Sequence, residues 1–346
     1  MSRFKHGLVV GKFWPLHAGH SALLREAEAC CVRTTVQLLA NHAEDVPLGV
    51  RAAWIREAHP GVQLVAAYDD HPVDFDDSRA WDAHMPIIVG HLKSPVDAVF
   101  TSDGYGAEMA RRLGATWVQV DSARRKNPVS GSAIRAQPHA YWWALAPCVR
   151  AWYTKRIVVV GAESTGTTTL AQDLAAVMAT EWVPEFGREW TIGREGGLDA
   201  SWSSDEFVRI AAEQSAREDA AARSVAVPWL VCDTDALATA VWHERYIGYR
   251  LPSLESLARL RPPWTYVLTC NDIPFVQDGW RDGQHVRQHM TDRFRAVLAD
   301  QPVCWIEVAG SRQTRVDEVM THVQEVDARA SCITASGTIQ RKAPMV

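Results

Sequence analysis

Apolar positions in the first 135 residues form short runs separated by helical stripes. Apolar runs of strand length lie at 7–11, 36–40, 63–67, 96–101 and 116–120. Between them, residues 21–31 place Leu23, Leu24, Ala27 and Cys31 on one helical face, and residues 107–113 predict another helix. Strands that alternate with helices indicate an α/β fold with a parallel sheet of the Rossmann-like kind.

A second α/β pattern follows a Pro- and Trp-containing stretch over residues 138–153. It begins with the β-branched run 156–160, and later strands are predicted at 229–232, 266–269 and 303–308. We therefore predict two domains, each with a parallel sheet, over residues 1–148 and 149–328. The weak patterning of residues 329–346 predicts a loose C-terminal tail.

Composition and charge narrow the class of protein. Hydrophobic residues make up 47% of the chain and charged residues 22%, as in a soluble globular enzyme. The sequence has no apolar run long enough to cross a membrane and no Cys-x-x-Cys among its seven cysteines, so we expect a cytoplasmic protein with reduced thiols. The net charge of −5 argues against nucleic acid as a partner and favours small anionic ligands. The oligomeric state stays open, a homo-oligomer included.

Residues 11–20 join the first strand to the first helix and contain two histidines. His17 and His20 are three residues apart at the helix start, so both imidazoles can face the side where the helix presents its N–H groups and its positive dipole end. Gly19 lets the backbone approach a nucleotide, and Lys12 adds positive charge. The alternatives are simple capping residues, or a metal pair that would need a third ligand.

A second motif, residues 130–135, lies at the other end of the same α/β unit. Ser130 or Ser132 can cap a helix, and Arg135 lies one turn further on, where its guanidinium can stabilise charge on leaving pyrophosphate. Alone, this would be an ordinary capped helix with a solvent-facing arginine. Together, the two motifs predict a nucleotidyltransferase, in which a substrate phosphate attacks the α-phosphate of a nucleoside triphosphate and the protein supplies positioning and charge.

These residues resemble the His-x-Gly-His and Ile-Ser-x-x-x-x-Arg signatures of the nucleotidyltransferase superfamily. Within it, the chain is similar to the bifunctional nicotinamide-nucleotide adenylyltransferase/ribosylnicotinamide kinase family, called NadR. The resemblance is carried by Gly11-Lys12-Phe13, by residues 15–20 and 101–106, by Asp121 and Arg124, and by Val129-Ser130-Gly131-Ser132. It implies AMP transfer from ATP to nicotinamide mononucleotide, giving NAD and pyrophosphate with Mg²⁺, and substrate-binding roles for Asp121 and Arg124.

Some members of that family carry an N-terminal helix-turn-helix that represses transcription. Here the first predicted strand begins within ten residues of Met1, so we expect no DNA-binding repressor. The acidic segment 69–77 is followed closely by Trp81, whose ring could stack on a cationic nicotinamide. A solvated acidic loop beside a core tryptophan explains the same pattern equally well. Arg51 and Trp54 carry the same ambiguity.

A phosphate-binding loop is predicted after the run 156–160. Its glycine spacing fits, and Thr168 falls at the position of the Mg²⁺-binding hydroxyl. Thr167 replaces the usual lysine, which by analogy removes a cationic group worth about 10³-fold in rate unless Lys155, Arg188 or a lid arginine replaces it. The alternative is a degenerate loop that binds nucleotide weakly or not at all. The expected nucleotide-binding residues are Gly161, Gly166, Thr167, Thr168 and Thr169.

Three downstream segments favour a kinase domain. Residues 184–190 resemble the Glu-aromatic-x-Arg-Glu stretch of the NadR family, residues 229–235 form an apolar strand that ends in acids, and residues 278–283 have the glycines and arginines of a lid. We expect Glu185 or Asp233 to accept the proton of a ribose 5′-hydroxyl. The remaining expected roles are Mg²⁺ binding by Thr168 and Asp233, phosphate binding by Arg281 and Arg287, and substrate binding by Arg188 and Asp235.

The resemblance implies that this second domain phosphorylates ribosylnicotinamide with ATP and Mg²⁺. Trp242 and Tyr246 fit either the wall of its pocket or the core of a helix pair. Two rivals remain: a domain that only senses nucleotide and regulates the first, or a nucleotidyltransferase for another small phosphorylated substrate.

Overall fold

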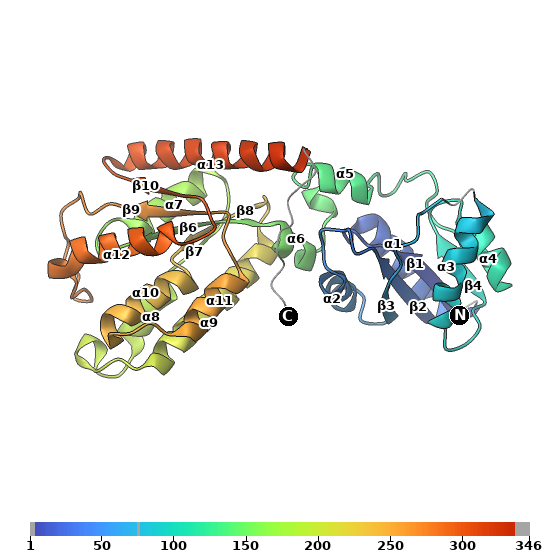
Figure 1. Ribbon diagram of the computed structural model, residues 1–346, viewed down its shortest axis with the longest axis horizontal. Coiled ribbons are helices and arrows are strands. Elements are labelled where there is room, and N and C mark those ends of the chain that lie inside the picture. Colours follow the sequence, from blue (N-terminus) through green and yellow to red (C-terminus); the bar gives the residue numbers. More distant parts are fainter. Residues whose placement is uncertain (1–3, 75–76, 336–346) are drawn as a thin grey trace. The chain divides into compact units, whose positions relative to one another are not determined.

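The computed structural model describes residues 4–74 and 77–335 of the chain. They belong to two compact units, with the boundary between Arg150 and Ala151. Each unit contains one five-stranded sheet in which every pairing is parallel (Figure 1). The predicted α/β class with two parallel sheets is confirmed.

The sheet of the first unit has the strand order β3-β2-β1-β4-β5. Its strands are β1 (Phe4–Gly11), β2 (Cys31–Ala40), β3 (Gln63–Tyr68), β4 (Ala98–Thr101) and β5 (Thr116–Gln119). The order changes direction beside β1, and ligands bind such sheets at the carboxyl ends of the strands near this switch point. The loop that follows Gly11 therefore begins where a ligand site is expected.

The helices of the first unit are α1 (Ala18–Cys30), α2 (Leu48–Ala58), α3 (Ser78–Gly90), α4 (Gly106–Leu113), α5 (Gly131–Ala136) and α6 (Pro147–Tyr153), the last of which runs across the boundary. Helices α3 and α4 pack on the sheet through a core cluster of Leu8, Leu39, Trp81, Ile88, Val96, Val99, Met109 and Ala110. The predicted helix 21–31 is wrong in its last residue, because β2 begins at Cys31 directly after α1.

The second unit has the strand order β10-β9-β6-β8-β7. Its strands are β6 (Lys155–Gly161), β7 (Trp182–Val183), β8 (Trp229–Asp233), β9 (Thr265–Thr269) and β10 (Trp305–Val308). Its helices are α7 (Thr167–Val177), α8 (Phe186–Gly193), α9 (Ser204–Ser224), α10 (Ala236–Ile247), α11 (Pro252–Leu260), α12 (Arg287–Ala299) and α13 (Arg312–Ala335). Because β6, β7 and β8 are parallel, the residues that follow them meet at one edge of the sheet.

The chain beyond residue 328 differs from the predicted loose tail. Helix α13 continues to Ala335, and residues 336–346 lie outside the described part of the chain. Val316, Val319 and Val323 of this helix are buried in the core cluster of the second unit. Helix formation is cooperative, so a helix anchored by packing in its first half extends past the last packed residue. In the described residues, no helix is both long and apolar enough to cross a membrane.

Trp81 lies in the core of the first unit, and only 2% of it is exposed. Replacing it with alanine is expected to lower the free energy of unfolding by about 3–5 kcal/mol, because the change removes buried apolar surface and leaves a cavity. Denaturant unfolding measures this change. Trp143→Ala is the matched control: Trp143 is 56% exposed, so its loss should change stability by less than about 0.5 kcal/mol. Equal effects of the two substitutions would contradict the core assignment.

Candidate functional site

The structure brings His17 and His20 together at the start of α1. His17 is the N-cap residue, and its Nδ1 accepts hydrogen bonds from the backbone N–H of Gly19 at 3.1 Å and of His20 at 3.3 Å. In the neutral ring the proton of His17 is therefore on Nε2, which can donate to a ligand. The two imidazole rings stack with their centroids 3.8 Å apart. Among the described residues, no three-ligand metal group includes either histidine, so the metal-pair alternative lacks its third ligand.

Both imidazoles are neutral at physiological pH. Burial, with a smaller contribution from the charge of Arg124, lowers the pKa of His17 to about 4. Burial and the neighbouring His17 hold the pKa of His20 well below its ordinary value. Neutral imidazoles can donate an N–H group to a phosphate without adding fixed positive charge, although in the structure His20 forms a hydrogen bond with the backbone oxygen of Pro15. Positive charge at the site must therefore come from the helix terminus and from nearby arginines.

Helix α5 is docked on the loop between β1 and α1. The side chain of Ser130 caps α5 by accepting a backbone N–H of its first turn at 3.2 Å. Arg135 donates from Nη1 to the backbone oxygen of Trp14 at 2.5 Å, and its guanidinium lies 3.6 Å from the centre of the Trp14 ring. Gly131 allows this approach, since a Cβ there would lie 2.6 Å from the same backbone oxygen. The two predicted motifs thus form one site. Ser132 belongs to it through its Oγ, 3.3 Å from Nη2 of Arg135.

The loop between β1 and α1 is also held by Glu44 of the β2–α2 loop and by Arg51 of α2. Nζ of Lys12 lies 2.7 Å from Glu44, and the guanidinium of Arg51 lies 2.6 Å from the other oxygen of the same carboxylate. Arg51 is 1% exposed and also donates to the backbone oxygen of Lys12 at 3.1 Å. Trp54 is buried as well. Arg51 and Trp54 therefore have packing roles, as in the structural alternative given for them above. Phe13 is likewise buried, with its ring 4.9 Å from that of His20.

Asp121 and Arg124, both implied by the family resemblance, lie in the loop after β5. The Asp121 carboxylate accepts backbone N–H groups from Arg125 at 3.0 Å and from Asn127 at 3.2 Å, so it shapes its own loop. Arg124 forms an ion pair with Asp103 at 3.1 Å, and its charge contributes to the lowered pKa of His17. Of these two residues, Arg124 is the one whose charge reaches the imidazole pair.

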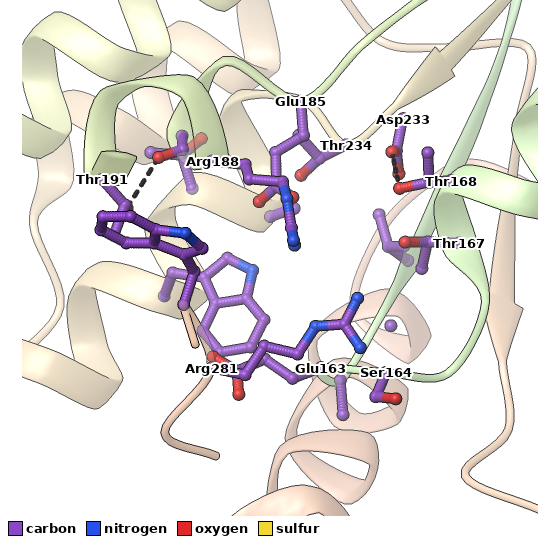
Figure 2. Close-up of a pocket in the computed structure, with 18 of the residues that line it drawn as sticks. Glu163, Ser164, Thr167, Thr168, Glu185, Arg188, Thr191, Asp233, Thr234 and Arg281 are labelled. Atoms are coloured by element: carbon purple, nitrogen blue, oxygen red, sulfur yellow. Dashed lines mark hydrogen bonds between the residues drawn. The ribbon is translucent and has the colours of Figure 1, made fainter. Parts of the chain in front are cut away.

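The second site is a pocket over the loop between β6 and α7 (Figure 2). It encloses about 1170 Å³, its open mouth included, and both the loop residues 161–169 and several aromatic side chains line it. Gly161 is required for close packing, because a Cβ there would lie 2.3 Å from Oγ1 of Thr269. Gly166 has a φ of 87°, in the left-handed region that favours glycine. Trp242 and Tyr246 are among the aromatic residues of the lining.

Three side chains predicted to carry chemistry face this pocket from adjacent strand ends. Oγ1 of Thr168 donates to Asp233 at 2.5 Å, and Asp233 is 2% exposed. Burial raises the pKa of Asp233, although hydrogen bonds from Thr168 and Thr167 oppose the shift. Burial and the charge of Asp233 raise the pKa of Glu185 to about 8. The hydroxyl and carboxylate oxygens of Thr168 and Asp233 are of the kind that Mg²⁺ prefers.

The structure limits what can replace the missing lysine. Lys155 lies at the opposite end of β6 from the loop, 2.7 Å from Asp327 and 4.3 Å from the centre of the Trp264 ring, so it is excluded. Arg188 and Arg281 both line the pocket with Thr167 (Figure 2). Arg188 is ion-paired with Asp278, and Nη1 of Arg281 donates to the backbone oxygen of Val276 at 2.8 Å. These two arginines are the remaining candidates.

Two residues predicted to bind phosphate or substrate, Arg287 and Asp235, do not line the pocket. Arg287 donates to the backbone oxygens of Ser164 at 3.0 Å and Ile273 at 3.1 Å, so it supports the loop and does not line the pocket. Asp235 caps α10 by accepting the N–H of Ala238 at 3.0 Å and accepts the Tyr266 hydroxyl at 2.7 Å, which occupies both its oxygens. Within the described residues that line the pocket, neither side chain appears.

Arg315 has a supporting role that the sequence does not predict. This residue is 4% exposed and donates from Nη1 to the backbone oxygen of Thr165 at 2.6 Å, across 150 positions of sequence. It supports the phosphate-binding loop from α13. No signal in the sequence distinguishes it from the solvent-facing arginines of an amphipathic helix.

The two units thus define a class of protein: an α/β unit with paired imidazoles at a helix N-terminus, followed by an α/β unit of the P-loop kinase-like kind. A family model described as an AAA domain matches residues 156–315. Two curated relatives, each named trifunctional NAD biosynthesis/regulator protein NadR, come from Salmonella typhimurium and Escherichia coli. Each is 24% identical over 297 residues, which cover 80% of this chain and 71% of the relative.

Solved structures of NadR proteins share the fold. One, in complex with NR, has a TM-score of 0.74 at 18% identity and covers 94% of this chain and 97% of its own. Another, in complex with NAD and AMP-PNP, has a TM-score of 0.70 at 19% identity and covers 95% of this chain and 97% of its own. Sequence and fold together confirm the resemblance to NadR-type proteins along most of the chain.

Proposed function

We propose that the chain is a bifunctional enzyme of NAD salvage. The first unit transfers AMP from ATP to nicotinamide mononucleotide, and the second phosphorylates ribosylnicotinamide to supply that substrate. The observation that carries the proposal is the joined site of His17, His20 and Arg135, in a chain similar to proteins named for NAD biosynthesis. The pocket with Thr168, Asp233 and Glu185 supports the second activity.

In the first unit, a phosphate oxygen of the mononucleotide attacks the α-phosphorus of ATP. A new P–O–P bond forms, the bond to the β-phosphate oxygen breaks, and pyrophosphate leaves. Neutral His17 and His20 donate N–H groups to the α-phosphate oxygens, where negative charge grows in the transition state. The N–H groups of α1 and the guanidinium groups of Arg124 and Arg135 stabilise the charge of the leaving group.

In the second unit, the ribose 5′-hydroxyl attacks the γ-phosphorus and ADP leaves. Glu185 accepts the hydroxyl proton, and Arg188 and Arg281 stabilise charge on the transferred group in place of the missing lysine. A Mg²⁺ held by Thr168 and Asp233 would neutralise charge on the phosphates. The aromatic residues of the pocket, Trp242 and Tyr246 among them, provide an apolar wall for the pyridine ring.

Ribosylnicotinamide phosphorylation is expected to speed up with rising pH. Since the pKa of Glu185 is raised to about 8, the base form is the minor form at neutral pH and predominates only above that value. The value of kcat/KM should therefore increase between about pH 6 and about pH 9 and then level off. Glu185→Gln should lower the rate and remove this rise. A rise that survives the substitution would assign the titration to another group. NAD formation, measured on the same protein, controls for general effects of pH.

A paired assay on one preparation of the full chain tests the proposed function. It measures NAD formed from nicotinamide mononucleotide and ATP, and separately mononucleotide formed from ribosylnicotinamide and ATP. Both products are expected. If neither forms, the substrate assignment is wrong, and the first unit would have to act on another small phosphorylated substrate.

Thr167 at the lysine position favours one alternative for the second unit, a domain that binds nucleotide and regulates the first unit without turnover. NAD formation alone, together with nucleotide binding by calorimetry, would support this alternative and would disprove the kinase activity.

A further inference from the structure

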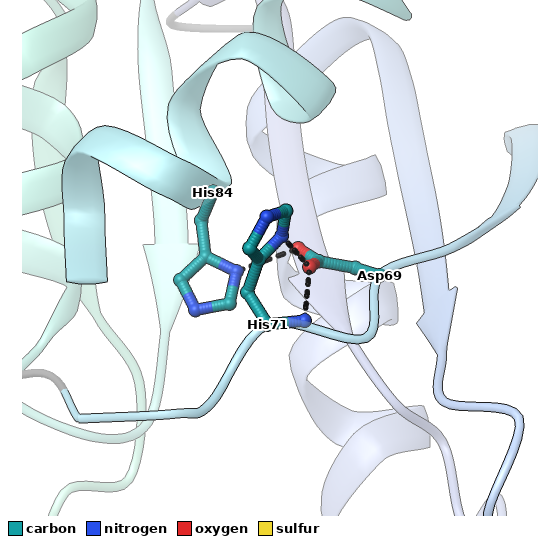
Figure 3. Close-up of side chains that lie close together, drawn as sticks. All are labelled: Asp69, His71 and His84. Atoms are coloured by element: carbon teal, nitrogen blue, oxygen red, sulfur yellow. Dashed lines mark hydrogen bonds and ion pairs between the residues drawn. The ribbon is translucent and has the colours of Figure 1, made fainter.

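Asp69, His71 and His84 form a compact cluster in the first unit (Figure 3). Nδ1 of His84 lies 2.6 Å from one carboxylate oxygen of Asp69, and Nδ1 of His71 lies 2.9 Å from the other. One ligand atom from each residue lies within 4.8 Å of the other two. The NAD chemistry proposed above assigns no role to these three residues.

The local structure fixes two of the three side chains. Asp69 follows β3 directly, and its backbone N–H donates to the backbone oxygen of Ala40 at 2.8 Å, which holds it beside the end of β2. His84 lies on the buried face of α3, between Trp81 and Ile88. His71 lies in the loop between β3 and α3, and its side chain is 49% exposed. The cluster therefore has two buried members and one member open to solvent.

We propose that Asp69, His71 and His84 bind a divalent transition-metal ion such as Zn²⁺. Two imidazole nitrogens and one carboxylate oxygen are a common set of three protein ligands for zinc, with a further position left to water or an anionic ligand. The imidazoles favour such an ion over Mg²⁺ or Ca²⁺, which prefer oxygen ligands. Metal–ligand bonds of about 2.0–2.1 Å in tetrahedral geometry separate the ligand atoms by about 3.4 Å. The three ligand atoms lie within 4.8 Å of one another, so metal binding requires them to adjust to that spacing.

The surroundings of His84 support this assignment. Its Nε2 lies 3.2 Å from the backbone oxygen of Pro72. A metal ion on Nδ1 leaves the ring proton on Nε2, which can then donate to that oxygen. Metal-binding histidines usually have such an outer partner, because it fixes the tautomer and the orientation of the ring. The alternative is a metal-independent link, in which both imidazoles donate from Nδ1 to Asp69 and tie the loop to α3.

Metal titration of the full chain distinguishes the two possibilities. After treatment with a chelator and its removal, binding of Zn²⁺ alone is measured by equilibrium dialysis with metal analysis, and Co²⁺ serves as the spectroscopic probe. The wild-type protein should hold one equivalent that His71→Ala releases. His71 is half-exposed, so the variant should fold. Loss of a direct ligand should lower the affinity by more than about tenfold, since even the loss of an outer partner costs that much.

A control variant and a second cluster variant show whether the Zn²⁺ binding is specific to the cluster. His91→Ala removes the exposed histidine that follows the last residue of α3, whose Nδ1 lies 2.8 Å from the backbone oxygen of Ile87. This variant should bind Zn²⁺ like the wild type. Asp69→Asn should weaken binding as His71→Ala does. Zn²⁺ should raise the midpoint of thermal unfolding of the wild type and of His91→Ala, and not of His71→Ala.

Equal Zn²⁺ affinity in the wild type and in His71→Ala would overturn the proposal, as would a wild type that binds no Zn²⁺. Either result would assign the cluster to the metal-independent link. These measurements use no substrate, so their outcome does not depend on the proposed enzyme activities.

Discussion

Replacing His20 with alanine is expected to lower the rate of NAD formation by about 10²–10³-fold, the usual effect of losing one donor to a developing oxyanion. The His20 ring is stacked on His17 at the start of α1, and the proposed mechanism requires its N–H group beside the α-phosphate. The pKa values of both imidazoles are lowered. The effect should therefore appear mainly in kcat, because a neutral donor contributes more as charge grows in the transition state than it does in the ground state.

Steady-state kinetics with nicotinamide mononucleotide and ATP measure this effect. His59→Ala is the matched control: it also removes a buried imidazole that contacts α1, with Nε2 3.0 Å from Oγ of Ser21. The control should lose stability with at most a small change in rate. Ribosylnicotinamide phosphorylation in the same His20 variant reports whether the second unit is intact. A decrease of less than about tenfold in the rate of NAD formation would contradict a catalytic role for His20 and would indicate that its ring serves only in packing.

Asp233→Asn is expected to abolish most ribosylnicotinamide phosphorylation while leaving the fold at least as stable. The lost carboxylate removes the acidic partner of Thr168, and we expect a decrease of at least about 10²-fold, as for other groups that stabilise transition-state charge. Burial raises the pKa of Asp233, which means that the protein interior disfavours its charged form. A neutral amide of the same shape removes that cost.

Phosphorylation assays, thermal unfolding and NAD formation are measured together on this variant. Asp235→Asn is the matched control, because it changes a buried acid two residues away that caps α10. Asparagine caps helices about as well as aspartate, so this control should keep both activities. Wild-type phosphorylation in Asp233→Asn, or an equal loss in Asp235→Asn, would contradict the assignment of Asp233 to the site.

The features that could be predicted from the sequence are local ones. The apolar runs that became β1, β6 and β9 are buried strands. In both phosphate-site motifs a strand ends at a glycine, and a short loop leads from it to a helix start. The relative position of His17 and His20, for example, depends only on the N-cap and the first three residues of α1. The lowered pKa values were not predictable, because they depend on burial by parts of the chain distant in sequence.

Other errors have identifiable causes. Lys155 is six residues before Gly161 on one strand, which separates them by about 20 Å, so strand geometry alone was enough to exclude it. Trp81 and a ligand-stacking tryptophan have the same sequence pattern, and only the packing of α3 on the sheet distinguishes them. Asp233 and Asp235 differ because the chain turns into α10 between them. Arg287 and Arg315 reach the loop through tertiary contacts that no local pattern records.

The two arginines behind the phosphate-binding loop also bear on the order in which the chain folds during synthesis. Arg287 and Arg315 donate to the backbone oxygens of Ser164 and Thr165, yet they leave the ribosome more than a hundred residues after the loop. The first unit can complete its core long before that moment, since domains generally fold as units during translation. The phosphate-binding loop, in contrast, acquires its support only when nearly the whole second unit has emerged. A stalled or shortened chain would therefore carry the proposed nucleotidyltransferase site without a finished P-loop.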